Sequence, residues 1–571
     1  MVKKRIFSFF LAVVIAAAGF AVPASAATKT EERYDRRMAQ LVRLLERDGG
    51  VTEAIGENGD AVAFLSVSDG TSRAVTVYAK TDSLSASLDK VLIKAKETGI
   101  YPKWLKLDVV TETEEISYDE FREKYTAGKR GGSFRRGIAF NDYFGRALLD
   151  SQLNSGGFVS YETGELDLEK INTYFRENGK KQLEKIPDTL YLFETRGYFT
   201  DGHACRLLDG AANTTGRRDF PTDPEGLLEL ASLSSAYLSN LTEPSGKFIY
   251  GYYPINDEEI GGYSIIRHAG TIWNMVLQYD MTRDEELLRS IDRAIGYLLG
   301  ELHYKDKKTA FLVSGDELNV GGNGITLLAL TNYAEIVGSD RYNDEIEALA
   351  NGILFMQKKD GGFTHALNKD YTVSRDYIIV FFDGEAMYGM LKAYGVLGKS
   401  KYLKGAEKAA DYFIANNYEE QHSHWIAYGF NELTKYSPLE KYFAFGLRNV
   451  DNDYLKQVKR TKSGSPTRGE TMGAAFELYD RLIRSGIECE ELKTFDEQLL
   501  IEAFEARINY GLNYFMFPEY AMYFADPAAV LNSFAIREDL FRIRIDDIQH
   551  FMGGYYLYYK NYDLVQSYKK A

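Results

Sequence analysis

A helical hairpin that recurs through the second half of the chain is the feature that most constrains its fold. The clearest copy runs from Phe382 to about Asn417. Apolar residues recur every three to four positions in both of its halves, which is the pattern of a buried helical stripe. Between the halves, the run Gly398-Lys399-Ser400 ends one helix and caps the next.

Twelve such helices are predicted after residue 223, in two alternating sets. The predicted outer helices begin near residues 223, 284, 340, 400, 438 and 495, and the predicted inner helices begin near residues 268, 322, 384, 424, 469 and 546. The spacing between copies is irregular, whereas an open array of repeats keeps a stricter period. We therefore expect the hairpins to close into a ring, with no β-sheet of more than three strands after residue 225.

The first part of the chain has a different pattern. Residues 27–205 alternate between helix-like and strand-like runs, which predicts a small α/β domain of unknown role. Helices are expected at 31–46, 83–98, 142–153 and 166–178, and strands at 61–67, 74–78, 104–110 and 189–195. Residues 206–222 lack periodicity and are interpreted as the linker to a domain formed by residues 223–571.

Residues 1–26 have the pattern of a secretory signal. Lys3, Lys4 and Arg5 precede an apolar run, and Ala24-Ser25-Ala26 matches a cleavage site. The mature protein is therefore expected to be exported, to the periplasm or the extracellular space. No later apolar run is long enough to span a membrane.

Charge and cysteine content exclude several classes of function. The net charge of −15 has no basic segment to offset it, which argues against a nucleic-acid partner. Only two cysteines are present, Cys205 and Cys489, so a fold built on disulfides and a cysteine-based zinc site are both excluded; whether the two pair is left open. A metal site from His424, His550 and Asp547 lacks the usual local spacings, and no cofactor is expected.

The run Gln357-Lys358-Lys359-Asp360-Gly361-Gly362-Phe363 resembles the Gln-x-x-x-Gly-x-Trp turn of the six-hairpin (α/α)6 toroid superfamily, with phenylalanine in place of tryptophan. The resemblance covers about residues 220–571. It implies a mainly α fold, in which a C-terminal (α/α)6 toroid follows the small α/β domain in the sequence. The superfamily includes glycoside hydrolases and sugar epimerases, so the resemblance implies a carbohydrate substrate but not one reaction.

In such a ring the inner helices run parallel, so residues at their first turns should converge on one funnel. The predicted catalytic residues are Glu385, Asp546, Asp547, His268, His424 and Glu470. The predicted substrate-binding residues are Arg267, Trp273, Asn323, Asp383, Trp425, Arg468, Arg544 and His550. Acidic residues also cap helices at these positions, but arginine and histidine are disfavoured there by the helix dipole.

Three functions fit these groups. In the first, Glu385 is the general acid and Asp546 or Asp547 the base of a glycosidase, with the arginines binding an acidic, uronate-containing polysaccharide or oligosaccharide. In the second, His268, His424 and His550 move protons in a sugar epimerase or lyase. In the third, the protein binds or assembles a glycan without catalysis.

Overall fold

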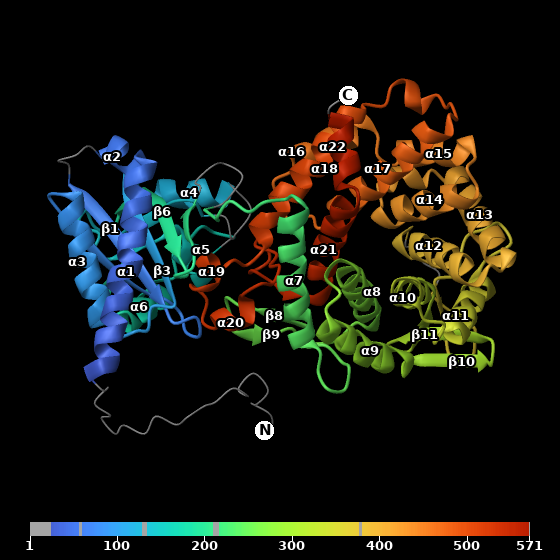
Figure 1. Cartoon of the computed structure of the whole chain (residues 1–571), viewed down its shortest axis with the longest axis horizontal. Coiled ribbons are helices and arrows are strands. Elements are labelled where there is room, and N and C mark those ends of the chain that lie inside the picture. Colours follow the sequence, from blue (N-terminus) through green and yellow to red (C-terminus); the bar gives the residue numbers. More distant parts are fainter. Residues whose placement is uncertain are drawn as a thin grey trace.

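The computed structural model describes residues 24–55, 60–127, 134–160, 162–208, 216–375 and 380–569, and these residues form two lobes (Figure 1). Residues 1–23 of the predicted signal and residues 209–215 of the predicted linker lie outside the described ranges. Strands and helices alternate in the N-terminal lobe, whereas the C-terminal lobe is a ring of helices.

An antiparallel sheet forms the centre of the N-terminal lobe, in the order β2-β1-β3-β6-β4-β5, with β7 also paired to β6. Its strands are β1 (Ala61–Ser68), β2 (Val75–Thr81), β3 (Trp104–Ser117), β4 (Gly137–Ala139), β5 (Ala147–Leu148), β6 (Thr189–Thr200) and β7 (Cys205–Leu208). Its helices are α1 (Ala24–Asp48), α2 (Gly50–Ile55), α3 (Leu84–Glu97), α4 (Tyr118–Ala127), α5 (Asp150–Gly156) and α6 (Leu168–Glu177).

Both faces of the central strands are buried. Leu65 and Leu107 belong to the core shared with α1 and α3, whereas Phe64 lies in the core on the opposite face, together with Met522 and Tyr523 of the C-terminal lobe. Successive residues of a strand point to opposite faces, so β1 needs apolar residues at almost every position.

Two parts of this lobe differ from the prediction. The expected helix at 142–153 is instead the short strand β5 followed by α5. The apolar run there is too short for its periodicity to distinguish a helix from a strand. Strand β7 begins at the predicted boundary, Cys205, continues into the predicted linker and pairs with β6, so the sheet extends past residue 205.

Six inner helices form the ring of the C-terminal lobe. They are α8 (Ile265–Thr282), α10 (Val320–Tyr333), α12 (Val380–Leu397), α14 (His424–Tyr436), α17 (Thr467–Ser485) and α21 (Ile545–Lys560). Each contacts the next in this order, and α21 contacts α8, so the ring closes as predicted.

Outer helices cover this ring. They are α7 (Pro224–Leu241), α9 (Glu285–Leu299), α11 (Asn343–Met356), α13 (Ser400–Ala415), α15 (Glu440–Arg448), α16 (Asn452–Arg460), α18 (Glu497–Gly511) and α22 (Tyr562–Lys569). Several begin at an aspartate whose side chain accepts backbone N–H groups of the first turn, as Asp223 does for α7 and Asp284 for α9.

The expectation that no sheet larger than three strands follows residue 225 is wrong. A five-stranded antiparallel sheet joins β10 (Leu302–Asp306), β11 (Thr309–Ser314), β12 (Glu317–Asn319), β13 (Ala366–Leu367) and β14 (Val373–Arg375). The connections from α9 to α10 and from α11 to α12 pair through β12 and β13. A smaller sheet joins β8 (Gly251–Tyr253), β9 (Glu258–Glu259) and β15 (Ile543–Arg544).

The two lobes meet through a segment of the C-terminal lobe that carries the short helices α19 (Pro518–Ala521) and α20 (Pro527–Val530), beside the N-terminal lobe in Figure 1. The Tyr523 hydroxyl lies 2.9 Å from Ser66 Oγ, and the ammonium of Lys106 lies 5.3 Å from the Tyr523 ring centroid. The amide of Ala74 donates to the carbonyl of Met522 at 2.7 Å.

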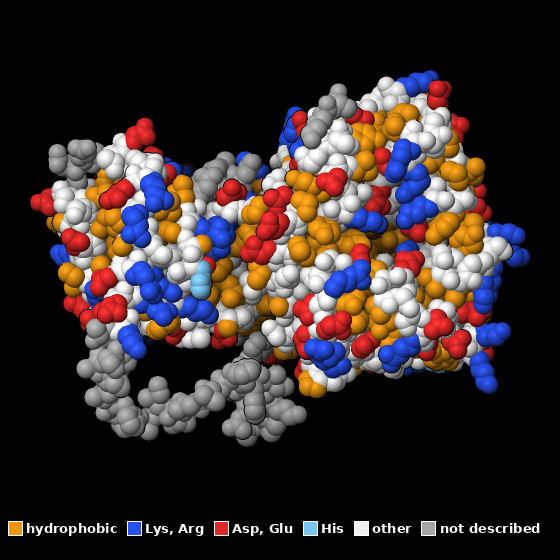
Figure 2. All heavy atoms as spheres, in the orientation of Figure 1, with side chains coloured by type: hydrophobic (Ala, Val, Ile, Leu, Met, Phe, Trp, Pro, Cys, Tyr) orange, Lys and Arg blue, Asp and Glu red, His pale blue; other side chains and the backbone are white. Residues whose placement is uncertain are grey.

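Three further observations concern the charge of the surface, the two cysteines and the character of the helices. On the face seen in Figure 2, basic and acidic side chains are interspersed over both lobes. Cys205 and Cys489 are free thiols. Among the described helices, none combines the length and the apolar character that crossing a membrane requires.

Candidate functional site

A cavity of about 630 Å³ lies at the N-terminal ends of the inner helices. This volume is within the usual range of small-molecule sites. The cavity is lined by Ser264, Ile266, Arg267, Gly270, Ile325, Phe381, Phe382, Glu385, Gln421, His422, Ser423, His424, Trp425, Thr467, Asp546, Gln549 and His550. Residues separated by almost 300 positions in the sequence therefore line the same cavity.

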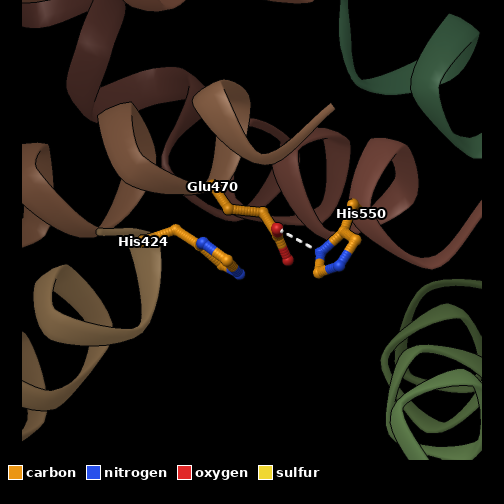
Figure 3. Close-up of side chains that lie close together, drawn as sticks. All are labelled: His424, Glu470 and His550. Atoms are coloured by element: carbon orange, nitrogen blue, oxygen red, sulfur yellow. Dashed lines mark hydrogen bonds and ion pairs between the residues drawn. The ribbon is translucent and has the colours of Figure 1, made fainter. Parts of the chain in front are cut away.

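Polar side chains from three inner helices come together beside this cavity: His424 and His550 line it, and the buried Glu470 contacts His550 (Figure 3). His424 begins α14, Glu470 lies in the first turn of α17, and His550 lies in α21. Nδ1 of His550 is 2.7 Å from Oε2 of Glu470, and the centroids of the two imidazole rings are 5.1 Å apart with perpendicular planes. Glu470 is fully buried, and the hydroxyl of Tyr428 donates to its Oε1 at 3.3 Å.

The two histidines have opposite pKa shifts. Burial, reinforced by the nearby His550, lowers the pKa of His424 well below its usual value of 6.5. Burial also acts to lower the pKa of His550, but the attraction of Glu470 and the hydrogen bond to it outweigh this and raise it. Of the two imidazoles, His424 therefore favours its neutral form and His550 favours its protonated form.

Glu385, in the first turns of α12, supplies a further acidic group to the wall. Its side chain is 5 % exposed, and among the described residues its Oε2 has no hydrogen-bond partner. Burial, with the added repulsion of Asp383, raises the pKa of Glu385 well above 4.5. This shift favours the protonated, neutral form of the carboxyl group.

Charged side chains beside His550 neutralise one another. Asp546 forms an ion pair of 2.8 Å with Arg267 and a second ion pair with Arg544. Asp547 accepts two hydrogen bonds of 3.0 Å from Arg542. Burial and the repulsion of Asp546 nevertheless raise the pKa of Asp547, against the attraction of the arginines. Of the three predicted arginines, Arg267 lines the cavity.

Aromatic rings form the floor. The Trp425 ring lines the cavity and lies 4.5 Å from the ring of His424, between centroids. Trp273 is buried behind it, with its ring centroid 5.7 Å from that of Trp425 and 5.5 Å from that of Tyr428. Trp273 therefore supports the floor rather than lining it.

Seven further predicted residues lie outside the cavity lining, namely Glu470, Asp547 and Arg544 described above and four that have contacts elsewhere. His268 is fully buried, with Nε2 3.0 Å from the carbonyl oxygen of Ala294. Asn323 bonds the backbone of residues in β11 and α11. Asp383 is paired with His365 at 3.0 Å. The guanidinium of Arg468 donates to the hydroxyl of Thr461.

Several polar lining residues were absent from the prediction. Gln549, His422 and Thr467 line the cavity, and each lies within two positions of a residue that was predicted. The predicted residues next to them were chosen because they are charged or aromatic, whereas Gln549 and Thr467 are neither charged nor aromatic. Only the orientation of each side chain around its helix could have identified them.

His424, Glu470 and His550 also present one ligand atom each within 4.8 Å of one another. Two imidazoles and a carboxylate suit several divalent transition metals. This set differs from the one considered in the sequence, because Asp547 is bound by Arg542. A metal bound through Nδ1 of His550 would displace its hydrogen bond to Glu470.

Comparison with known proteins finds similarity in structure but not in sequence. No protein-family model matches the chain, and no curated protein does. A D-mannose isomerase is similar over 60% of this chain and 100% of its own, with 14% identity and a TM-score of 0.46. A cellobiose 2-epimerase from Spirochaeta thermophila is similar over 60% of this chain and 98% of its own, with 10% identity and a TM-score of 0.44. An unsaturated glucuronyl hydrolase specific for heparin is similar over 60% of this chain and 98% of its own, with 11% identity and a TM-score of 0.42. The closed ring of helical hairpins is established by the helix contacts described above.

Proposed function

We propose that this protein is a sugar isomerase or epimerase that moves a proton at the carbon next to a carbonyl group. The observation that carries the proposal is the pair formed by His424 and His550, whose rings are 5.1 Å apart on one cavity and whose pKa values are shifted in opposite directions. One group ready to accept a proton and one ready to donate it are what such a reaction needs.

In the proposed step, neutral His424 removes the proton from C2 of an open-chain sugar. The charge that develops on the carbonyl oxygen is stabilised by the protonated His550, which Glu470 keeps charged and oriented. Return of the proton from His424 to C1, with a proton passing from the C2 hydroxyl to O1 through His550, gives the isomer. Delivery of a proton from His550 to the other face of C2, with the original C2 proton kept on His424, gives the epimer. Glu470 acts through His550 and is a positioning residue.

The substrate we propose is a free sugar or the reducing end of an oligosaccharide. Trp425 offers a face for a sugar ring, and Arg267, Gln549 and Asp546 offer hydrogen bonds to hydroxyl groups. Arg267 is already paired with Asp546, so it gives less support to a uronate preference than three free arginines would. We place the reaction outside the cytoplasm, because residues 1–26 have the pattern of an export signal.

Solvent isotope exchange tests this reaction. Purified protein is incubated in D2O with neutral aldoses and with uronates, and the sugars are analysed by mass spectrometry and NMR. One deuterium at C1 or C2, with or without a change of sugar, is the expected result. His424→Ala and His550→Ala should each lower the exchange rate by about 10² to 10⁴-fold, the usual worth of one positioned acid or base. Exchange that survives in both variants contradicts the proposal.

Hydrolysis of a glycosidic bond is the second candidate. The raised pKa of Glu385 supports it, since a glycosidase needs an acid of raised pKa, and Asp546 lines the same cavity as the candidate base. New reducing ends from acidic or neutral polysaccharides, without deuterium at carbon, would favour this reaction. Binding without either product would favour a glycan-binding or assembly protein.

A further inference from the structure

Glu385 is a buried acid that the proposed proton transfer at carbon leaves unused. It lines the same cavity as His424 and His550 but comes from α12, which contributes neither histidine. Its Oε2 has no hydrogen-bond partner among the described residues, and its side chain is 5 % exposed. An unsatisfied buried carboxyl group is costly, so a structural role alone does not explain it.

The neighbouring helix is shaped to accommodate this carboxyl group. A methyl group at Gly321 of α10 would overlap both Oε2 of Glu385 and the ring of Phe382. Further along the same helix, a methyl group at Gly324 would overlap the backbone of Glu385. The glycines let α10 and α12 approach closely. The rings of Phe381 and Phe382, 4.9 Å apart, line the same cavity as Glu385.

We infer that Glu385 is the catalytic acid that opens the cyclic form of the sugar before proton transfer at carbon. This inference rests on the proposed function, because only a reaction at C2 of the open chain requires ring opening. Free aldoses are almost entirely cyclic hemiacetals, in which C1 is not a carbonyl carbon and the proton on C2 is not acidic. The two histidines are occupied with the chemistry at C1 and C2, so ring opening needs a separate acid.

The step balances with one water molecule from the cavity. Glu385 donates its proton to the ring oxygen, and the bond between C1 and that oxygen breaks. The electrons of the O1–H bond form the second bond of the carbonyl group, and the O1 proton passes to water. The water returns a proton to the Glu385 carboxylate, so the acid is restored and no oxidant or reductant is involved.

Mutarotation measures this step without any chemistry at carbon. Freshly dissolved α-mannose and α-glucose are followed by polarimetry, with the spontaneous rate subtracted. The wild-type protein and the His424→Ala variant should both accelerate mutarotation. Glu385→Gln should lose this acceleration by about 10²-fold or more. Glu335→Gln is the matched control, since Glu335 follows the C-terminal end of α10, away from the cavity.

A second measurement shows that the variant is folded and competent. Glyceraldehyde cannot form a ring, so Glu385→Gln should exchange its C2 proton with D2O at close to the wild-type rate. Loss of exchange with glyceraldehyde, or mutarotation retained by Glu385→Gln, would overturn the inference. Wild-type protein that does not accelerate mutarotation would overturn it too. Failure of the proposed function is a separate result, namely no deuterium at carbon from any sugar.

Discussion

His550 Nδ1 lies 2.7 Å from Glu470 Oε2, although 80 positions separate the two residues in the sequence. The fully buried carboxylate orients the imidazole and favours its protonated form. His550 itself lines the cavity. The pair therefore joins α17 to α21 and at the same time sets the charge of the site.

Removing the charge of Glu470 should weaken catalysis through His550. Glu470→Gln keeps the shape of the side chain, so we expect kcat to fall by about 10²-fold with little change in KM. The alkaline limb of the pH profile should move to lower pH, because His550 loses the partner that raises its pKa. Glu477→Gln, on the same helix but bonded to Asn431 and Asn561, should leave that limb in place.

The pH dependence of the isotope exchange should be bell-shaped. The raised pKa of His550 keeps this group protonated above pH 6.5, and the rate should fall as the pH rises through it. On the acid side, protonation of the base His424, whose pKa burial lowers well below 6.5, should stop removal of the C2 proton. Burial also raises the pKa of Glu470 above 4.5 against the opposing effect of His550, so protonation of Glu470 should remove the ion pair. A rate that increases steadily with pH would contradict this assignment of acid and base.

Substitution of Arg267, which lines the cavity, and of Arg468, which does not, should have different effects on KM. Arg267→Ala should raise KM by roughly tenfold, about 1.4 kcal/mol, since one charged hydrogen bond to the substrate is lost. Arg468→Ala should leave KM unchanged, because its guanidinium bonds Thr461 and does not line the cavity. Measuring both variants with a uronate and with a neutral sugar shows whether Arg267 selects charge.

His268 should make the protein less stable in mild acid. Burial lowers its pKa to about 4 from 6.5, against the opposing hydrogen bond to Ala294, so between these values the unfolded chain binds a proton that the folded chain does not. Stability is therefore lost as the pH falls from about 6.5 to about 4, by about 3 kcal/mol at most. In urea titrations, His268→Gln should flatten this slope. An unchanged slope would mean that other groups cause it.

Tyr523 should couple the two lobes. Tyr523→Ala removes a fully buried ring from the interface and should cost about 3–5 kcal/mol, seen in calorimetry as separate unfolding transitions of the two lobes. Tyr523→Phe loses only the hydrogen bond to Ser66 and should cost about 1 kcal/mol. A single unshifted transition for Tyr523→Ala would show that the lobes do not depend on this contact.

The sequence determined the helices of the ring and the end at which a site would form. Helical periodicity and capping are local properties, so α12 and α13 were predicted from the residues within them. The polar first turns of the inner helices then placed the cavity at their N-terminal ends. The sheet from β10 to β14 escaped prediction because its strands are short and pair between connections far apart in the chain.

Tertiary structure alone decided which side of each helix faces the cavity. Successive residues of a helix are rotated by about 100°, so Arg267 lines the cavity while the adjacent His268 is buried against the carbonyl of Ala294. In the same way Thr467 lines it and Arg468 does not. The sequence specifies that such residues lie at a helix start, but their direction depends on how the helix is rotated by packing against its neighbours. That rotation also brings His424, Glu470 and His550 together, which no local pattern could show.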